Sequence, residues 1–193
     1  MIAASLAAGD QQFPEIDTDR ALVEAAQQDP SEFAGIYTRY ARRVFLYVRS
    51  RVSTEEDAVD ITQQVFVKSF QALPKYRPSA APISAWLFRI ARNACIDHQR
   101  RSRPATPIDA VAAVLRAPDH GPEEEALRTE DVERLRRALS GLDVAKRDLL
   151  ALRYAGNLRI KEIAKTTGRS EEATKKQLSR ALKTLRQQYD AIS

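Results

Sequence analysis

Apolar residues recur at spacings of three and four through most of the chain, which is the spacing of one helix face. In the first half, one such stripe consists of Phe33, Ile36, Tyr37, Tyr40, Val44 and Val48. The stripe follows Asp29-Pro30-Ser31-Glu32, which reads as an N-cap, a proline at the first helical position and an acid in the first turn. This pattern predicts a helix that begins near residue 30.

Two more helices are predicted in the same half. The capping box Ser53-Thr54-Glu55-Glu56 starts the first, and its apolar positions stop near Pro74. The segment from Lys75 to Pro82 holds two prolines and is expected to be a loop. The next helix is expected from about Ser84 to Arg101, because Pro104 cannot continue it.

Residues 104–130 contain four prolines and a cluster of acids, and we interpret them as a flexible acidic linker in which 108–115 is at most a short helix. Helical periodicity returns from Glu130 onward. The predicted fold is all-α, with two small helical domains at 19–103 and 131–193, preceded by an N-terminal tail over 1–18.

The net charge of +5 hides an uneven distribution. Residues 19–103 carry 14 Lys and Arg against nine Asp and Glu, and residues 131–193 carry 15 against eight. The segment 104–130 carries two against six. Two basic blocks joined by an acidic connector indicate a polyanionic partner, with nucleic acid the leading candidate. The alternative is that these charges form only a solvated helical surface.

Composition excludes several classes of protein. A single cysteine cannot form an internal disulfide, which favours a reducing compartment, and we expect a cytoplasmic location. No segment approaches the roughly 18 apolar residues of a membrane span. We expect no metal or other cofactor, because Cys95 and His98 lack the further ligands of a zinc site. Asp97 and His98 have no nucleophile at a motif spacing, so an enzyme is not expected.

The helix predicted over 84–101 has an apolar face around Leu87 and a basic face opposite. The basic face and its continuation contain Arg89, Arg92, Arg100 and Arg103. Guanidinium groups are permanently charged and bind phosphates bidentately, so this row suits a nucleic-acid backbone. The alternative is pairing with acids of a neighbouring element. In the loop before this helix, Tyr76 is the candidate for stacking on an unpaired base, whereas Trp86 and Phe88 are expected to pack in the core.

The last sixty residues carry the pattern of a helix-turn-helix. Ile160, Ile163 and Ala164 mark a short helix, Gly168 suits the turn, and Ser170 is an N-cap for the next helix. The outward face of that helix presents Glu172, Lys175, Lys176, Ser179, Arg180 and Lys183. We expect it to enter the DNA major groove, with Arg180 reading guanine and Lys175 and Lys183 contacting phosphates.

Two alternatives to this interpretation stay open. The first concerns Glu172, which either accepts a hydrogen bond from a cytosine amine or only compensates the helix dipole. The second alternative is that the whole motif is a helical hairpin that does not bind DNA.

These motifs resemble the extracytoplasmic-function sigma factors of bacterial RNA polymerase. Three segments of this chain resemble region 2 of that family: Asp57-Ala58-Val59-Asp60-Ile61-Thr62-Gln63-Gln64-Val65-Phe66, Ser84-Ala85-Trp86-Leu87-Phe88-Arg89-Ile90-Ala91-Arg92-Asn93, and Ile96-Asp97 with the arginines after it. Three later segments resemble region 4 of the same family: Leu152-Arg153-Tyr154, Ile160-Lys161-Glu162-Ile163-Ala164 and Leu178-Ser179-Arg180-Ala181-Leu182. The resemblance covers nearly everything from residue 20 to 188 except the linker.

The resemblance implies a transcription initiation factor with several contact surfaces. Core RNA polymerase would be bound through its β′ clamp helices, by Asp57, Asp60, Gln63, Gln64 and Phe66, and through its β flap. The promoter −10 element would be melted and held by Tyr76, Arg89, Arg92, Asn93, Arg100 and Arg103. The recognition helix that follows Ser170 would read the −35 element, and the linker would run through the polymerase cleft. An anti-sigma factor is a further partner that the family implies.

The chain departs from the family pattern in three places. Gln64 stands where an acid is usual, Asp143-Val144 replaces a proline-rich entry to region 4, and Lys176-Gln177 replaces small and arginine residues. The −35 sequence therefore cannot be transferred from relatives. Two other functions stay open: a stand-alone helix-turn-helix regulator, which would bind duplex promoter without polymerase, and a helical adaptor that sequesters a protein partner.

Overall fold

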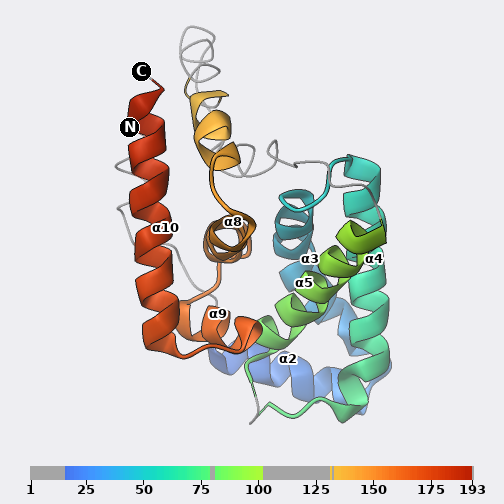
Figure 1. The fold of residues 1–193 in the computed structure, drawn as a ribbon. Coiled ribbons are helices and arrows are strands. Elements are labelled where there is room, and N and C mark those ends of the chain that lie inside the picture. Colours follow the sequence, from blue (N-terminus) through green and yellow to red (C-terminus); the bar gives the residue numbers. More distant parts are fainter. Residues whose placement is uncertain (1–15, 79–80, 102–130, 132, 193) are drawn as a thin grey trace, which may run out of the picture.

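The computed structural model describes residues 16–78, 81–101, 131 and 133–192, and every regular element among them is helical (Figure 1). The all-α prediction is confirmed. The first half forms a bundle of α2 (Ile16–Gln28), α3 (Phe33–Arg49), α4 (Glu55–Ala72) and α5 (Ile83–Arg101). Short 3₁₀ turns, η1 (Pro30–Glu32) and η2 (Leu73–Lys75), precede α3 and follow α4. We call this bundle the first block.

The second block consists of a helical segment over 133–140, α8 (Val144–Leu150), the π-helical turn η3 (Ala151–Ala155), α9 (Ile160–Thr167) and α10 (Glu171–Ala191). Figure 1 shows α10 as a long helix along the side of the molecule away from α4. The predicted linker, the short helix considered at 108–115 and the N-terminal tail over 1–15 lie outside the described residues.

Side-chain caps fix where several helices begin. Asp29 accepts a hydrogen bond from the Ser31 amide, as predicted, and Ser170 accepts one from the Ala173 amide. Thr54, rather than Ser53, caps α4 by accepting from the Asp57 amide. These oxygens satisfy amide groups that have no partner within the helix, which stabilises each helix start by about 1 kcal/mol.

Helix α2 is an element that the hydrophobic pattern did not predict. Its buried positions include Val23 and Ala26, and this stripe is too short and too rich in alanine to be distinctive. Long-range polar contacts hold it instead: Tyr40 donates to the Asp19 carboxylate at 2.7 Å, and Gln27 donates to the carbonyls of Leu73 and Tyr76. Tertiary contacts therefore place α2, and local sequence does not.

The two blocks pack directly against each other, α5 on α9 and α3 on η3, and their buried residues form one continuous core. Gly156, after η3, lies at this junction. A Cβ atom built on Gly156 would come within 2.7 Å of the Phe88 ring and 2.8 Å of the Leu152 carbonyl oxygen. Only glycine therefore permits the observed approach of η3 to the first block.

We predict that Gly156→Ala lowers the free energy of unfolding by about 1–3 kcal/mol, because overpacking displaces the Phe88 ring or the backbone. Thermal or urea unfolding followed by circular dichroism measures this loss. The matched control is Gly141→Ala, whose new methyl group meets only the flexible end of the Gln188 side chain. Equal stabilities of the two variants would contradict the proposed packing role of Gly156.

Candidate polymerase and nucleic-acid interface

The outward face of α4 combines polar and apolar side chains. Asp60, Gln63 and Gln64 are exposed, as a docking surface requires. The same side of the helix also exposes Val67 by 55% and Phe70 by 45%. Exposed apolar side chains beside polar ones are typical of surfaces that bind proteins. The sequence interpretation counted Phe70 among the apolar positions of this helix and gave neither Val67 nor Phe70 a role at the surface.

Two residues assigned to the same docking surface lie differently. Phe66 is buried, and its ring packs at 4.8 Å from Tyr37, so it supports the α4 face without being part of the surface. Asp57 is half-buried, accepts a hydrogen bond from the Thr54 hydroxyl and lies 3.7 Å from the His98 imidazole. The exposed part of the predicted set is therefore Asp60, Gln63 and Gln64.

The basic face of α5 is partly accessible. Arg89, Asn93 and Arg100 are exposed, and among the described residues Arg100 forms a solvated ion pair with Asp97 at 3.9 Å. An exposed ion pair of this kind contributes little to stability, so it leaves the guanidinium available to another anion. Arg103 lies outside the described residues.

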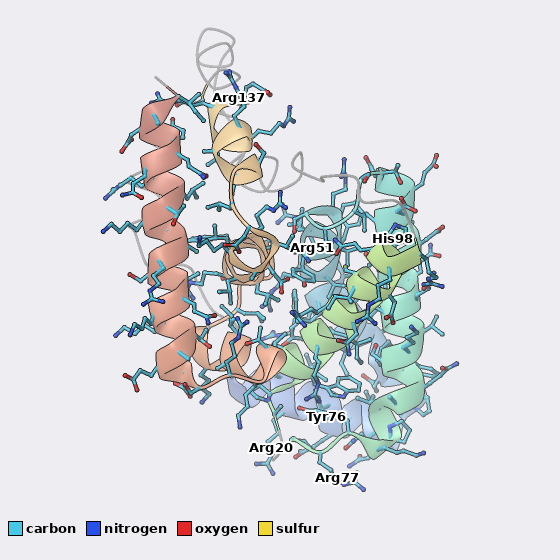
Figure 2. All side chains as sticks on the ribbon, in the orientation of Figure 1. Arg20, Arg51, Tyr76, Arg77, His98 and Arg137 are labelled. Atoms are coloured by element: carbon cyan, nitrogen blue, oxygen red, sulfur yellow. The ribbon has the colours of Figure 1, made fainter. Side chains whose placement is uncertain are left out.

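Tyr76 is buried, which corrects the expectation of an exposed stacking surface. Its hydroxyl donates to the Ala81 carbonyl at 2.6 Å, and its ring lies 4.8 Å from the Trp86 ring. Burial raises the pKa of Tyr76 to about 12. Figure 2 shows Tyr76 at the end of the bundle where the loop before α5 crosses α2. In this arrangement Tyr76 anchors the loop through its hydroxyl and its contact with Trp86.

The helix-turn-helix has the predicted geometry. Gly168 has φ +69°, in the left-handed region that the tight turn after α9 requires and that glycine adopts without strain. Helix α10 buries Leu178, Ala181 and Leu185. All of the predicted DNA-contacting residues on it are exposed, namely Glu172, Lys175, Lys176, Ser179, Arg180 and Lys183.

Arg92 differs from the other arginines of α5 because its guanidinium faces the second block. Its Nε donates to Asp148 Oδ2 at 2.7 Å, and the Arg92 side chain is 31% exposed. Burial opposes the charged form, but the hydrogen bond and the charge of Asp148 outweigh it and raise the pKa of Arg92. Here the alternative interpretation, an arginine paired with an acid of a neighbouring element, describes the observed contact.

Asp148, on α8, is the acid at the centre of this junction. Besides Arg92, it accepts a hydrogen bond from the Tyr47 hydroxyl at 2.9 Å and lies 3.7 Å from Arg51 Nε. The side chains of Arg51 and Asp148 are each only 7% exposed. Figure 2 shows Arg51 on the side of the first block that faces α8. Burial and the Asp148 charge raise the pKa of Tyr47 well above its ordinary value, so this hydroxyl keeps its proton.

Further polar contacts join the blocks. Arg43 donates to the carbonyl of Gly156 at 2.7 Å and to that of Asn157 at 2.9 Å, and its guanidinium lies over the Tyr40 ring. At the other end, Thr166 donates to the Ala85 carbonyl at 3.2 Å. The Ser84 hydroxyl donates to the Glu162 carboxylate, which also accepts from the Arg159 amide. The sequence interpretation gave none of these residues a role between blocks.

Neither a cluster of metal ligands nor a membrane-spanning helix is present among the described residues. They contain no group of three His, Cys, Asp or Glu side chains that could hold a metal ion. Cys95 is buried, and burial raises the pKa of its thiol to about 12, which makes it a packing residue. None of the described helices is both long enough and apolar enough to cross a membrane.

Comparison with known proteins identifies both blocks. The model for Sigma-70 region 2 matches residues 36–104, and the model for Sigma-70 region 4 matches residues 132–185. The chain is 31% identical over 180 residues to the ECF RNA polymerase sigma factor SigD of Mycobacterium tuberculosis, covering 90% of this chain and 84% of SigD. It is 30% identical to RpoE of Cereibacter sphaeroides, another ECF sigma factor, over 83% of this chain and 87% of RpoE.

A solved structure shares the arrangement of the helices. CnrH in complex with the cytosolic domain of CnrY matches with a TM-score of 0.68 and 27% identity, covering 91% of this chain and 99% of that chain. The helical bundle with its basic helix thus matches region 2, and the helix-turn-helix block that follows it matches region 4. The CnrH structure has the same overall fold. This chain belongs to the ECF sigma factors of bacterial RNA polymerase.

Proposed function

We propose that this sigma factor binds core RNA polymerase and directs it to promoters by reading the −35 element with α10 and the −10 element with α5. The observation that carries the proposal is the accessibility of two basic surfaces on separate blocks: the α10 face around Arg180 and the α5 face around Arg89 and Arg100. Phosphate contacts from such arginines and lysines position DNA, whereas contacts with base edges give specificity.

The two surfaces cannot serve both elements in the packed arrangement. Elements centred near −35 and −10 are about 25 base pairs apart, which is roughly 85 Å of B-form duplex at 3.4 Å per step. In the structure α5 packs directly on α9, the helix that precedes α10. The 29 residues 102–130 between the described parts have a maximal covalent length of about 100 Å. Promoter recognition therefore requires the blocks to separate, and the chain is long enough for it.

Polymerase docking is assigned to the outward face of α4. Asp60 and Gln63 supply polar contacts to the β′ clamp helices, and Val67 and Phe70 supply the apolar centre that protein interfaces need. The second block would contact the β flap. The similarity to CnrH, which was solved in complex with the cytosolic domain of CnrY, supports an anti-sigma factor as a further partner.

Run-off transcription tests this function directly. Purified protein added to core RNA polymerase and genomic fragments is expected to give discrete transcripts that neither component gives alone. Tight binding of the protein alone to duplex promoter, with no transcript in the presence of core enzyme, would favour a stand-alone regulator instead.

The docking assignment predicts a loss of polymerase binding without a loss of fold. Replacing Asp60 and Gln63 with alanine removes two exposed polar groups and should weaken binding to a β′ clamp-helix fragment by about tenfold or more. Fluorescence titration measures the affinity. Gln187→Ala with Asp190→Ala is the matched control, because it removes the same two residue types, also exposed, from α10. Unchanged affinity of the Asp60 and Gln63 variant would remove the assignment.

The −35 assignment predicts two distinguishable defects on α10. Arg180→Ala should cost about 1–3 kcal/mol and relax preference at one base position. Lys175→Ala should weaken binding evenly across sequences and reduce the salt slope by about 1, because a phosphate contact carries no base information. Selection of promoter variants by holoenzyme measures both profiles. A base preference unchanged by Arg180→Ala would make Arg180 a backbone contact.

A further inference from the structure

The junction around Asp148 contains more positive charge and more donors than its single carboxylate uses. Arg51 and Arg92 bring two guanidinium groups, and Tyr47 adds a hydroxyl donor. Arg51 Nε is buried and has no hydrogen-bond partner among the described residues, since Asp148 Oδ1 at 3.7 Å is beyond hydrogen-bond distance. A buried donor on a charged group is costly when it is left without a partner.

These groups all belong to the first block, and only their anion comes from the second. Tyr47 lies on α3, Arg51 lies just after α3, and Arg92 lies on α5. Gln99 of α5 donates to the Arg51 carbonyl at 2.8 Å, which ties the Arg51 backbone to the same helix that carries Arg92. The first block therefore holds a cationic site with a fixed geometry, and Asp148 fills it as a ligand would.

We propose that Tyr47, Arg51 and Arg92 form a phosphate-binding site for promoter DNA, and that the Asp148 carboxylate occupies it as an internal ligand while the two blocks are packed together. This inference rests on the proposed function and adds a site and its regulation to it. A phosphodiester carries the same single negative charge as the carboxylate and offers acceptor oxygens in a tetrahedral arrangement. Guanidinium groups bind the oxygens of phosphates and of carboxylates in the same bidentate way, so either anion fits beside Arg51 and Arg92.

Two consequences follow from the exchange of anions. While Asp148 is in place, the charge of Arg92 is neutralised and Arg51 is covered, so the α5 face is incomplete as a DNA surface. When the blocks separate, Asp148 leaves and the site becomes available beside Arg89. Opening of the molecule and completion of the DNA surface are then one event, controlled by a single carboxylate.

The experiment uses the full chain without polymerase and a single strand of twelve thymidines as the probe, because a phosphate contact needs no particular base. Asp148→Asn keeps the side-chain shape and removes the charge. We expect this variant to have a larger radius of gyration by small-angle X-ray scattering. By fluorescence anisotropy it should bind the probe about tenfold more tightly, with a salt slope steeper by about 0.7–1.4 for one or two added phosphate contacts.

Three further variants complete the test. Asp190→Asn removes the same charge from an exposed position on α10 and should leave the radius unchanged and the affinity nearly so. Adding Arg92→Ala to Asp148→Asn should keep the expansion and abolish most of the gain in affinity. Tyr47→Phe, which removes one hydrogen bond to Asp148 and keeps the buried ring, should shift both measurements in the same direction by less. Circular dichroism verifies that each variant is folded.

Two outcomes would overturn the inference. If Asp148→Asn is as compact as the wild type and binds the probe equally, then Asp148 does not occupy a DNA site. If the variant expands but its affinity does not depend on Arg92, then Asp148 is a structural clamp and the phosphate site does not exist. Both outcomes concern the free protein, so they are distinguishable from a failure of the proposed function, which run-off transcription with core polymerase tests.

Discussion

The Asp148 carboxylate and the Arg51 guanidinium are almost fully removed from water between the two blocks, and the Arg92 guanidinium, which is about a third exposed, pairs with the same carboxylate. This ion-pair group joins the two blocks. Moving an ion out of water costs several kcal/mol even after the protein relaxes, and attraction between close partners repays this only with good geometry. Arg92 has that geometry at 2.7 Å from Asp148, whereas Arg51 at 3.7 Å has it only in part. The net contribution of these ion pairs to the stability of the packed state is therefore small. Removing one partner would nevertheless be costly, because it would leave a buried charge without a partner.

Besides the continuous apolar core, further polar contacts join the blocks at both ends of the junction. Arg43 satisfies the carbonyls of residues 156 and 157, and Thr166 donates to the Ala85 carbonyl. Water satisfies such polar groups well when the surfaces part, unlike the apolar groups of the shared core. Interfaces between domains of one chain are generally more polar than permanent ones, and relative motion is the default expectation unless the interface is large and hydrophobic. The Phe88 ring against Gly156 adds an apolar contact that makes the fit specific.

The sequence predicted the local elements well because periodicity and caps are local. It located α3, α4, α5 and the helix-turn-helix, and Asp29 and Ser170 cap as expected. It missed α2, whose position depends on contacts such as Tyr40 with Asp19, 21 residues apart. It also placed Tyr76 on the surface, because a proline-rich loop gives no sign that one of its side chains returns to the core.

Local sequence patterns could not predict the contacts between the blocks, because these contacts also join residues far apart in the sequence. They change the interpretation of the basic face of α5. Arg92 and Asp148 are 56 residues apart, and Arg43 and Gly156 are 113 apart, so no spacing rule connects them. A helical wheel groups Arg92 with Arg89 and Arg100, because it treats all members of a face as equivalent. The structure separates them, because Arg92 lies at the edge of the face that turns toward α8 whereas Arg89 and Arg100 are exposed. Two adjacent parts of one helix face thus differ in their relation to the second block: Arg89 and Arg100 are exposed beside it, whereas Arg92 is paired with its acid Asp148.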